Sequence, residues 1–245
     1  MKASPAEQQE LLRLQALDTR LQQLAHRLGA LPQTPAIAAL DDEDAAIRRG
    51  RAESLGSLED ARTELSRIES DVQLVEARIQ RDGDRLQATS SVKDVQALEA
   101  ELVSLRRRLA ELEDMELVVM QRVEDAEAVV AGQDAERAGI AERRAALEAE
   151  RNAAAGDLGV DREHAERDRE AVASGIPAEL LALYERKRLT GGGVGAALLQ
   201  QRACGGCTMT LTGSDYEAVR RAAADEVLFC PECDRILVRT EESGL

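Results

Sequence analysis

The sequence predicts a mainly α-helical protein: a long antiparallel helical hairpin of the coiled-coil type, followed by a small β-rich domain. Of its 245 residues, 32% are charged and 1% are aromatic, with no Trp, one Phe and two Tyr. Apolar residues, many of them leucine, recur at spacings of three and four within the first 150 residues, whereas all four cysteines follow residue 200. Such a composition is typical of long helices, because aromatic side chains normally supply much of the buried area of a globular core.

The first helix is predicted to begin at a capping box. Ser4 and Glu7 have the required spacing, and Pro5 occupies the first helical position, which suits proline. The helix should end near Ala30, because prolines follow at positions 32 and 35. A heptad seam is formed by Leu14, Leu17, Leu21, Leu24, Leu28 and Leu31.

A second helix is expected to begin within residues 41–44, where four consecutive acidic residues suit the positive end of a helix dipole. It should reach about Gln87, with Asp82 as the one polar residue in its seam. The turn residues 89–91 then predict a tight antiparallel reversal. The seam consists of Leu58, Ala61, Leu65, Ile68, Val72, Val75, Ile79 and Leu86.

The third predicted helix is the longest and runs from about residue 93 to residue 170. At 1.5 Å per residue it would span on the order of 110 Å, which matches the first two helices placed end to end. We therefore expect both to pack antiparallel along it, since long helices need burial as well as intrinsic propensity. Its apolar register begins at Val95 and ends at Leu147, with polar interruptions at Glu116, Gln133, Arg137 and Arg144.

The helical domain is assigned to residues 1–175 and the β-rich domain to residues 176–245, because Gly175 and Pro177 interrupt the helical pattern. A short helix through Leu180 and Tyr184 should bridge the two, and another should begin at Ser214. Short strands are expected at 198–202, 208–211, 227–229 and 236–238.

The four cysteines form the strongest chemical motif in the chain. Two Cys-x-x-Cys pairs, 22 residues apart, can each direct two thiolates at one ion, so they predict a closed tetrahedral site for one structural zinc ion. Disulfides fit less well because a cytosolic chain is expected, and a thioredoxin-type redox pair fits less well because two matched pairs flank predicted strands. An iron–sulfur cluster remains compatible with four cysteines. The predicted ligands are Cys204, Cys207, Cys230 and Cys233.

The residues around these pairs resemble a bacterial family of coiled-coil proteins with a C-terminal C4-type zinc ribbon. The likeness includes Met209 and Leu211 after the first pair, residues 235–237 after the second, and Ser91 to Asp94 at the hairpin turn. Asp234 departs from the pattern, since the family usually has glycine there, but Asp tolerates a left-handed turn. The resemblance implies interaction with nucleic acid or protein partners, without a known reaction.

The net charge of −15 argues against nucleic-acid binding by the helical part. Residues 1–175 carry 24 basic and 37 acidic side chains, a net charge of −13, whereas residues 176–245 carry 8 and 10, a net charge of −2. Binding to RNA or DNA would therefore require a local basic patch on the ribbon. The candidates for contact with nucleic acid or another partner are Arg186, Lys187, Arg188, Arg202, Arg220, Arg221 and Arg235.

Two noncatalytic functions follow. The first is a zinc-ribbon adaptor that binds RNA or DNA, with the coiled coil as a spacer or a protein-docking arm; the second is a protein–protein scaffold without nucleic-acid contact. No enzyme motif is evident, and His26 and His164 lack convergent partners, so we expect neither catalysis nor a small-molecule substrate. The sequence lacks an apolar run long enough for a membrane span and a signal-peptide pattern, so a cytoplasmic location is expected.

Overall fold

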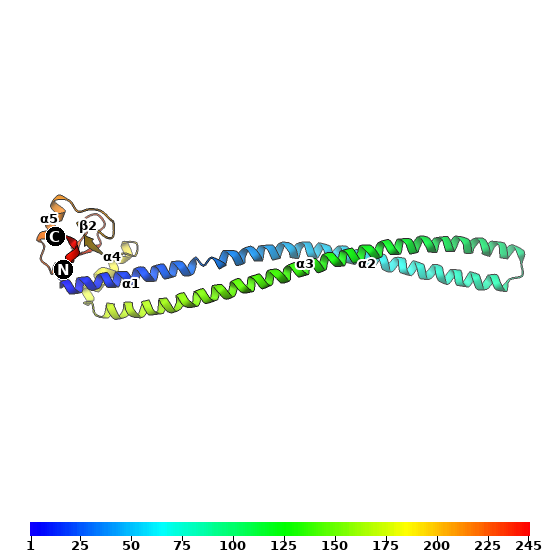
Figure 1. Cartoon of the computed structure of the whole chain (residues 1–245), viewed down its shortest axis with the longest axis horizontal. Helices are drawn as coiled ribbons and strands as arrows, with labels where there is room; N and C mark the ends of the chain where they lie inside the picture. The colour runs from blue at the N-terminus through cyan, green and yellow to red at the C-terminus, as the bar shows by residue number, and fades with distance from the viewer. The chain divides into compact units, whose positions relative to one another are not determined.

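The computed structural model describes all residues, Met1–Leu245, and confirms the mainly α-helical fold with a small strand-containing C-terminal region (Figure 1). Its elements are α-helices (α), β-strands (β) and one 3₁₀ helix (η). In chain order the elements are α1 (Pro5–Gly29), α2 (Gln33–Ala88), α3 (Val92–Ser174), α4 (Ala178–Thr190), β1 (Ala196–Gln200), β2 (Ala203–Cys204), α5 (Gly213–Arg221), β3 (Leu228–Phe229), β4 (Ile236–Val238) and η1 (Glu241–Ser243).

Contacts between residues divide the chain into two compact units. One contains Met1–Thr34 together with Ala149–Leu245, and the other contains Pro35–Glu148. The predicted division at residue 175 follows the sequence pattern and stays a prediction. The contacts instead group α1 and the last part of α3 with the C-terminal region, and this grouping determines the surroundings of the site described below.

The starts of the first two helices show how local chemistry sets helix boundaries. In α1 the capping box is confirmed: the Glu7 amide donates to Ser4 Oγ at 3.3 Å, and the Ser4 amide donates to Glu7 Oε2 at 2.6 Å. In contrast, α2 begins at Gln33, so the predicted start within residues 41–44 is wrong. Pro35 is accommodated in the first turn of α2, where backbone amides have no helical acceptor.

The acidic residues 41–44 bind α3 instead of marking a helix start. Asp41 pairs with Arg144 at 2.8 Å, and Asp44 pairs with Arg137 at 2.8 Å. Both arginines were predicted to be polar interruptions of the apolar register. Their stems can cover the apolar stripe while the guanidinium groups reach carboxylates on the neighbouring helix.

Within the unit of residues 35–148, α2 and α3 pack antiparallel, as predicted. The ion pairs Arg51–Asp134 and Arg78–Glu101 fix this direction. The polar break at Asp82 is buried in the seam, where it accepts a hydrogen bond from Arg85. The central apolar cluster consists of Ile68, Leu112 and Val119, flanked by Leu65, Val72 and Val75. No helix of the chain has both the length and the apolar character that a bilayer crossing would need.

In the other unit, the predicted seam of α1 serves two different partners. Leu24 packs against Leu158 and Ala165 of α3, as expected for the hairpin. Leu14 instead belongs to the core shared with α4 and the strands, and Leu28 is exposed. The leucine heptad of α1 therefore does not reveal where its packing partner changes from α4 and the strands to α3.

The strands form one four-stranded sheet in the order β2-β1-β4-β3. Strands β1 and β4 are parallel, with Ala196 opposite Ile236, whereas the other two pairs are antiparallel. The strand predicted at 208–211 is wrong, because that segment contributes only an isolated bridge between Thr210 and Ala203. A second bridge joins Lys2 to Glu226, which brings the N-terminal residues to the sheet region.

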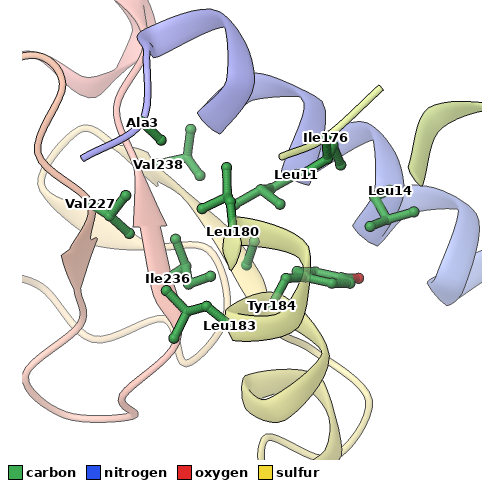
Figure 2. Close-up of a cluster of buried hydrophobic side chains, with 11 residues drawn as sticks. Ala3, Leu11, Leu14, Ile176, Leu180, Leu183, Tyr184, Val227, Ile236 and Val238 are labelled. Atoms are coloured by element: carbon green, nitrogen blue, oxygen red, sulfur yellow. The ribbon is translucent and has the colours of Figure 1, made fainter. Parts of the chain in front are cut away.

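Alternate residues of β1 and β4 divide the buried side chains between two clusters. Ala196, Ile236 and Val238 face a core built with α1 and α4, and Figure 2 shows the side chains of these elements converging. The intervening Ala197 and Leu237 belong to the cluster that contains the cysteines. The sheet thus lies between the helical base and the metal site, because strand side chains alternate between faces.

Gly195 marks the closest contact between this sheet and α4. A Cβ atom at this position would lie 2.7 Å from the Tyr184 carbonyl oxygen and 2.9 Å from its ring. Gly195→Ala is therefore expected to destabilise the unit by about 2 kcal/mol through overpacking. Gly132→Ala in α3, where nothing lies within 4 Å, should instead stabilise the chain by about 0.5–1 kcal/mol. Urea denaturation of both variants measures the two changes, and equal effects would contradict this account.

Candidate metal centre and the base of the ribbon

The four predicted ligands converge on one point. Their sulfur atoms all lie within 4.8 Å of one another, with Cys204 Sγ 3.9 Å from Cys233 Sγ and Cys207 Sγ 3.8 Å from Cys230 Sγ. Tetrahedral Zn–S bonds of about 2.3 Å place neighbouring sulfurs about 3.8 Å apart. A disulfide would require about 2.05 Å, and all four cysteines are free. The donor set therefore fits one structural zinc ion.

Each Cys-x-x-Cys pair is held in the same kind of turn. The amide of Thr208 donates to the Cys204 carbonyl at 2.7 Å, and the amide of Asp234 donates to the Cys230 carbonyl at 2.9 Å. Both closing residues have positive φ angles, 64° for Thr208 and 58° for Asp234. The repeated turn directs both thiols of a pair to the same side of the backbone.

The surroundings of the thiols differ. Burial raises the pKa of Cys204 and raises the pKa of Cys230 to about 12. Burial also opposes ionisation of Cys233, but hydrogen bonding by Arg235 and by the Cys207 and Cys230 thiols together outweighs it and lowers the pKa of Cys233 to about 7. Since zinc binds thiolates, metal binding at neutral pH is expected to release the protons of the buried Cys204 and Cys230 thiols.

The left-handed conformation of Asp234 confirms that the site accommodates the departure from the family's usual glycine. Asp234→Gly should change the unfolding free energy by no more than about 0.5 kcal/mol, because glycine adopts this φ freely. Asp234→Val should lower it by about 1–2 kcal/mol, since a β-branched residue is strained there. Both variants lose the ion pair with Lys187, so thermal unfolding with zinc present isolates the backbone effect. Equal stability of the two would contradict it.

A buried polar network lies beneath the sheet, where α1 meets α4 and the loop before β1. Gln15 is 8% exposed, and its Oε1 accepts from Tyr184 Oη at 3.1 Å and from the Gly195 amide at 2.7 Å. Its Nε2 donates to the Gly193 carbonyl at 3.1 Å. One α1 side chain thus holds the start of β1, which carries the cysteine cluster on its other face.

Asp18 occupies the centre of this network. It is 4% exposed, and its carboxylate accepts from Arg169 Nε and from Tyr184 Oη, each at 2.6 Å. Arg188 lies 3.5 Å from the same carboxylate, and Glu185 binds both arginines. Burial and the Asp18 carboxylate together raise the pKa of Tyr184 above its usual range, so the phenol stays a neutral donor. The network connects α1, α3 and α4.

The predicted basic residues do not form one free patch. Lys187 pairs with Asp234 and Arg188 with Glu185, while Arg220 and Arg221 share Glu217. Arg235 links the second cysteine turn to the loop before β1, because its guanidinium donates to the carbonyl oxygens of Gly191 and Val194.

Four of the predicted basic residues are exposed: Arg220 and Arg221 in their pairs with Glu217, and Arg186 and Arg202 without an ion pair. Arg202 stacks over the Tyr216 ring, with its guanidinium carbon 4.2 Å from the ring centroid. Arg186 lies on α4 and makes no side-chain ion pair. Together with the paired residues, the seven candidates are distributed over α4, the β1–β2 turn, α5 and the second cysteine turn.

Sequence reasoning did not identify Gln15, Asp18 or Arg169 as important residues. Each is a polar residue within a charged helical pattern, and only the fold brings them to a common point. The one weak sequence signal was that Gln15 directly follows the seam residue Leu14. Leu14 is buried among the strands, and Gln15 enters the same core.

Together, the fold and the cysteine site define a coiled-coil hairpin protein with a C-terminal C4-type zinc ribbon. The model of the CT398-like coiled coil hairpin domain matches residues 14–192, and that of the C4-type zinc ribbon domain matches residues 203–237. The chain therefore belongs to the CT398-like coiled-coil hairpin family, as the sequence resemblance indicated.

Relatives with the same organisation occur in mycobacteria. The chain is 37% identical over 245 residues to the uncharacterized protein MT2288 of Mycobacterium tuberculosis, and 98% of each is covered. A structure from Mycobacterium smegmatis has a TM-score of 0.86 at 31% identity, covering 98% of this chain and 100% of that one. The CT398 structure from Chlamydia trachomatis has a TM-score of 0.65 at 20% identity, covering 96% and 98%, which supports the fold.

Proposed function

We propose that this protein is a noncatalytic adaptor whose zinc ribbon, held on the base of the hairpin, binds a protein partner. The observation that supports this most strongly is that most of the candidate basic side chains already have a partner within the chain. Six of the seven candidates for nucleic-acid contact have an intramolecular partner: Lys187, Arg188, Arg202, Arg220, Arg221 and Arg235.

Phosphate binding requires cations that are free and gathered on one face. Here most of the cations already have a carboxylate, carbonyl or aromatic partner within the chain, and the ribbon residues 176–245 carry a net charge of −2. Four thiolates around a zinc ion would add further negative charge. Few stacking groups are also present for single-stranded bases, since Phe229, Tyr184 and Tyr216 are the only aromatic residues and Tyr184 is fully buried.

Nucleic-acid binding through the ribbon is the second candidate function, and the exposed Arg186 and Arg202 favour it. Fluorescence anisotropy with labelled single-stranded RNA and duplex DNA, at two salt concentrations, tests it on the zinc-loaded protein. A protein adaptor predicts no salt-sensitive binding. Affinity that falls steeply with salt and disappears in an Arg186→Ala, Arg202→Ala double variant would establish the nucleic-acid function instead.

The protein-binding function has its own test. A photo-crosslinking residue at Met209, which is exposed beside the first cysteine pair, should capture a specific protein in cells of the native organism. The same residue placed at Val92, exposed at the start of α3, serves as a control for nonspecific capture. Absence of any protein specific to the ribbon position would contradict the proposal.

A further inference from the structure

The unit that contains the ribbon has a groove between α1 and the first strand of the sheet. Its volume is about 710 Å³, within the range of about 300–1,000 Å³ that is typical of pockets for small ligands or a few side chains. One wall is a single face of α1, and the other is formed by β1, the loop before it and the first cysteine turn. The full lining consists of residues 12, 15, 16, 19, 20, 23, 24, 27, 161, 194, 196–198, 205 and 206.

The groove combines an apolar floor with two cations. Leu12, Ala16, Ala197 and Leu198 supply apolar surface. Arg20 and Arg27 are its only basic lining residues, and Asp161 is its only acidic one, so the lining carries a net charge of +1.

The two guanidinium groups are poorly satisfied within the chain. Arg20 lies 3.7 Å from Asp161, outside hydrogen-bond distance, and both side chains are more than half exposed. Arg27 is exposed and makes no ion pair. Neither arginine belongs to the basic set predicted from the sequence. A groove whose lining carries a net charge of +1, on a chain with a net charge of −15, favours an acidic ligand by charge complementarity.

We infer that this groove binds a short acidic peptide segment of a protein partner, with apolar side chains on the floor and carboxylates at Arg20 and Arg27. Guanidinium groups suit carboxylates because they donate in a planar, two-pronged geometry. A nucleic-acid strand fits less well, because the lining has no aromatic ring and only one net positive charge. This inference rests on the proposed protein-binding function and assigns that function a surface and a partner chemistry.

The experiment uses the zinc-loaded full chain and a random heptapeptide library displayed on phage. Selected peptides are expected to be enriched in Asp and Glu together with Leu, Ile or Val. In fluorescence anisotropy, the Kd of the best labelled peptide should rise at least about tenfold in Arg20→Glu and in Arg27→Glu, because each variant replaces an attraction by a repulsion.

Two further variants separate groove binding from general charge effects. Arg13→Glu changes the same charge on α1 at an exposed residue outside the groove, and it should leave the Kd within about twofold. Ala16→Glu places a carboxylate on the groove floor and should weaken binding, whereas Ala16→Gln, of similar size, should weaken it less. Circular dichroism and zinc content confirm that each variant is folded.

Selection of no peptide, of peptides without acidic residues, or of peptides whose Kd is the same in all variants would overturn the groove assignment. The Arg20→Glu, Arg27→Glu double variant is also examined by crosslinking at Met209. If it still captures the same protein, the adaptor function stands and the partner binds elsewhere. RNA binding that depends on Arg20 and Arg27 would overturn the inference in favour of a nucleic-acid ligand.

Discussion

Cys204→Ser is expected to unfold the zinc ribbon while most of the helical structure persists. Cys204 is fully buried in a cluster with Leu199, Leu211 and Leu237, so its loss removes both a metal ligand and part of a small core. Zinc supplies about 10–16 kcal/mol of apparent binding free energy in small zinc-finger peptides, which is as large as the stability of a typical domain. This region of the chain therefore depends on the metal for its folded state.

Hydrogen exchange measured by mass spectrometry tests this expectation. Amide protection should disappear over residues 196–238 in Cys204→Ser and in the chelator-treated wild type, and zinc content should fall well below one ion per chain. Protection within residues 35–148 should remain, because that unit has its own apolar cluster and ion pairs. Thr212→Ser, an exposed change in the same ribbon, serves as the control. A ribbon that keeps its protection without metal would show that its own core suffices.

Asp18→Ala is expected to lower the unfolding free energy of the unit that contains the ribbon by about 3 kcal/mol, because it leaves Arg169 and Arg188 without their shared, buried carboxylate. Tyr184 Oη also loses its shorter acceptor. The partners of Asp18 come from α3 and α4, so removal of this one side chain weakens several contacts together.

Asp161→Ala is the matched control, since it removes a carboxylate from the same unit that is 51% exposed and only loosely paired with Arg20. Its effect should stay below about 0.5 kcal/mol, as for exposed ion pairs in general. Denaturant unfolding followed by hydrogen exchange over residues 1–34 and 149–245 compares the two variants. Equal losses would mean that the Asp18 network contributes no more than a surface pair.

Local sequence patterns determined most of the helical architecture. The capping box at Ser4 fixed the start of α1, since its hydrogen bonds join residues three positions apart. The heptad seams likewise predicted the antiparallel packing of α2 and α3. The start of α2 was misplaced because proline is harmful inside a helix but tolerated in its first turn, and the sequence alone did not distinguish these positions.

The metal site was equally accessible from sequence. Each Cys-x-x-Cys turn encodes its own geometry, and two such turns need only to meet. The short strands were less accessible: β2 has two residues and was missed, and the segment at 208–211 forms only one bridge. Such strands follow from the turns that hold the cysteines and have little propensity of their own.

The chain by itself thus determined the helices, the hairpin and the ligands of the metal, because these depend on neighbouring or regularly spaced residues. Tertiary structure alone decided that Leu14 packs with the strands, that Gln15 and Asp18 hold the base of the ribbon, and that Lys187 and Arg235 are engaged by distant segments of the chain. These features join residues more than 40 positions apart, whose proximity arises only when the folded elements pack together.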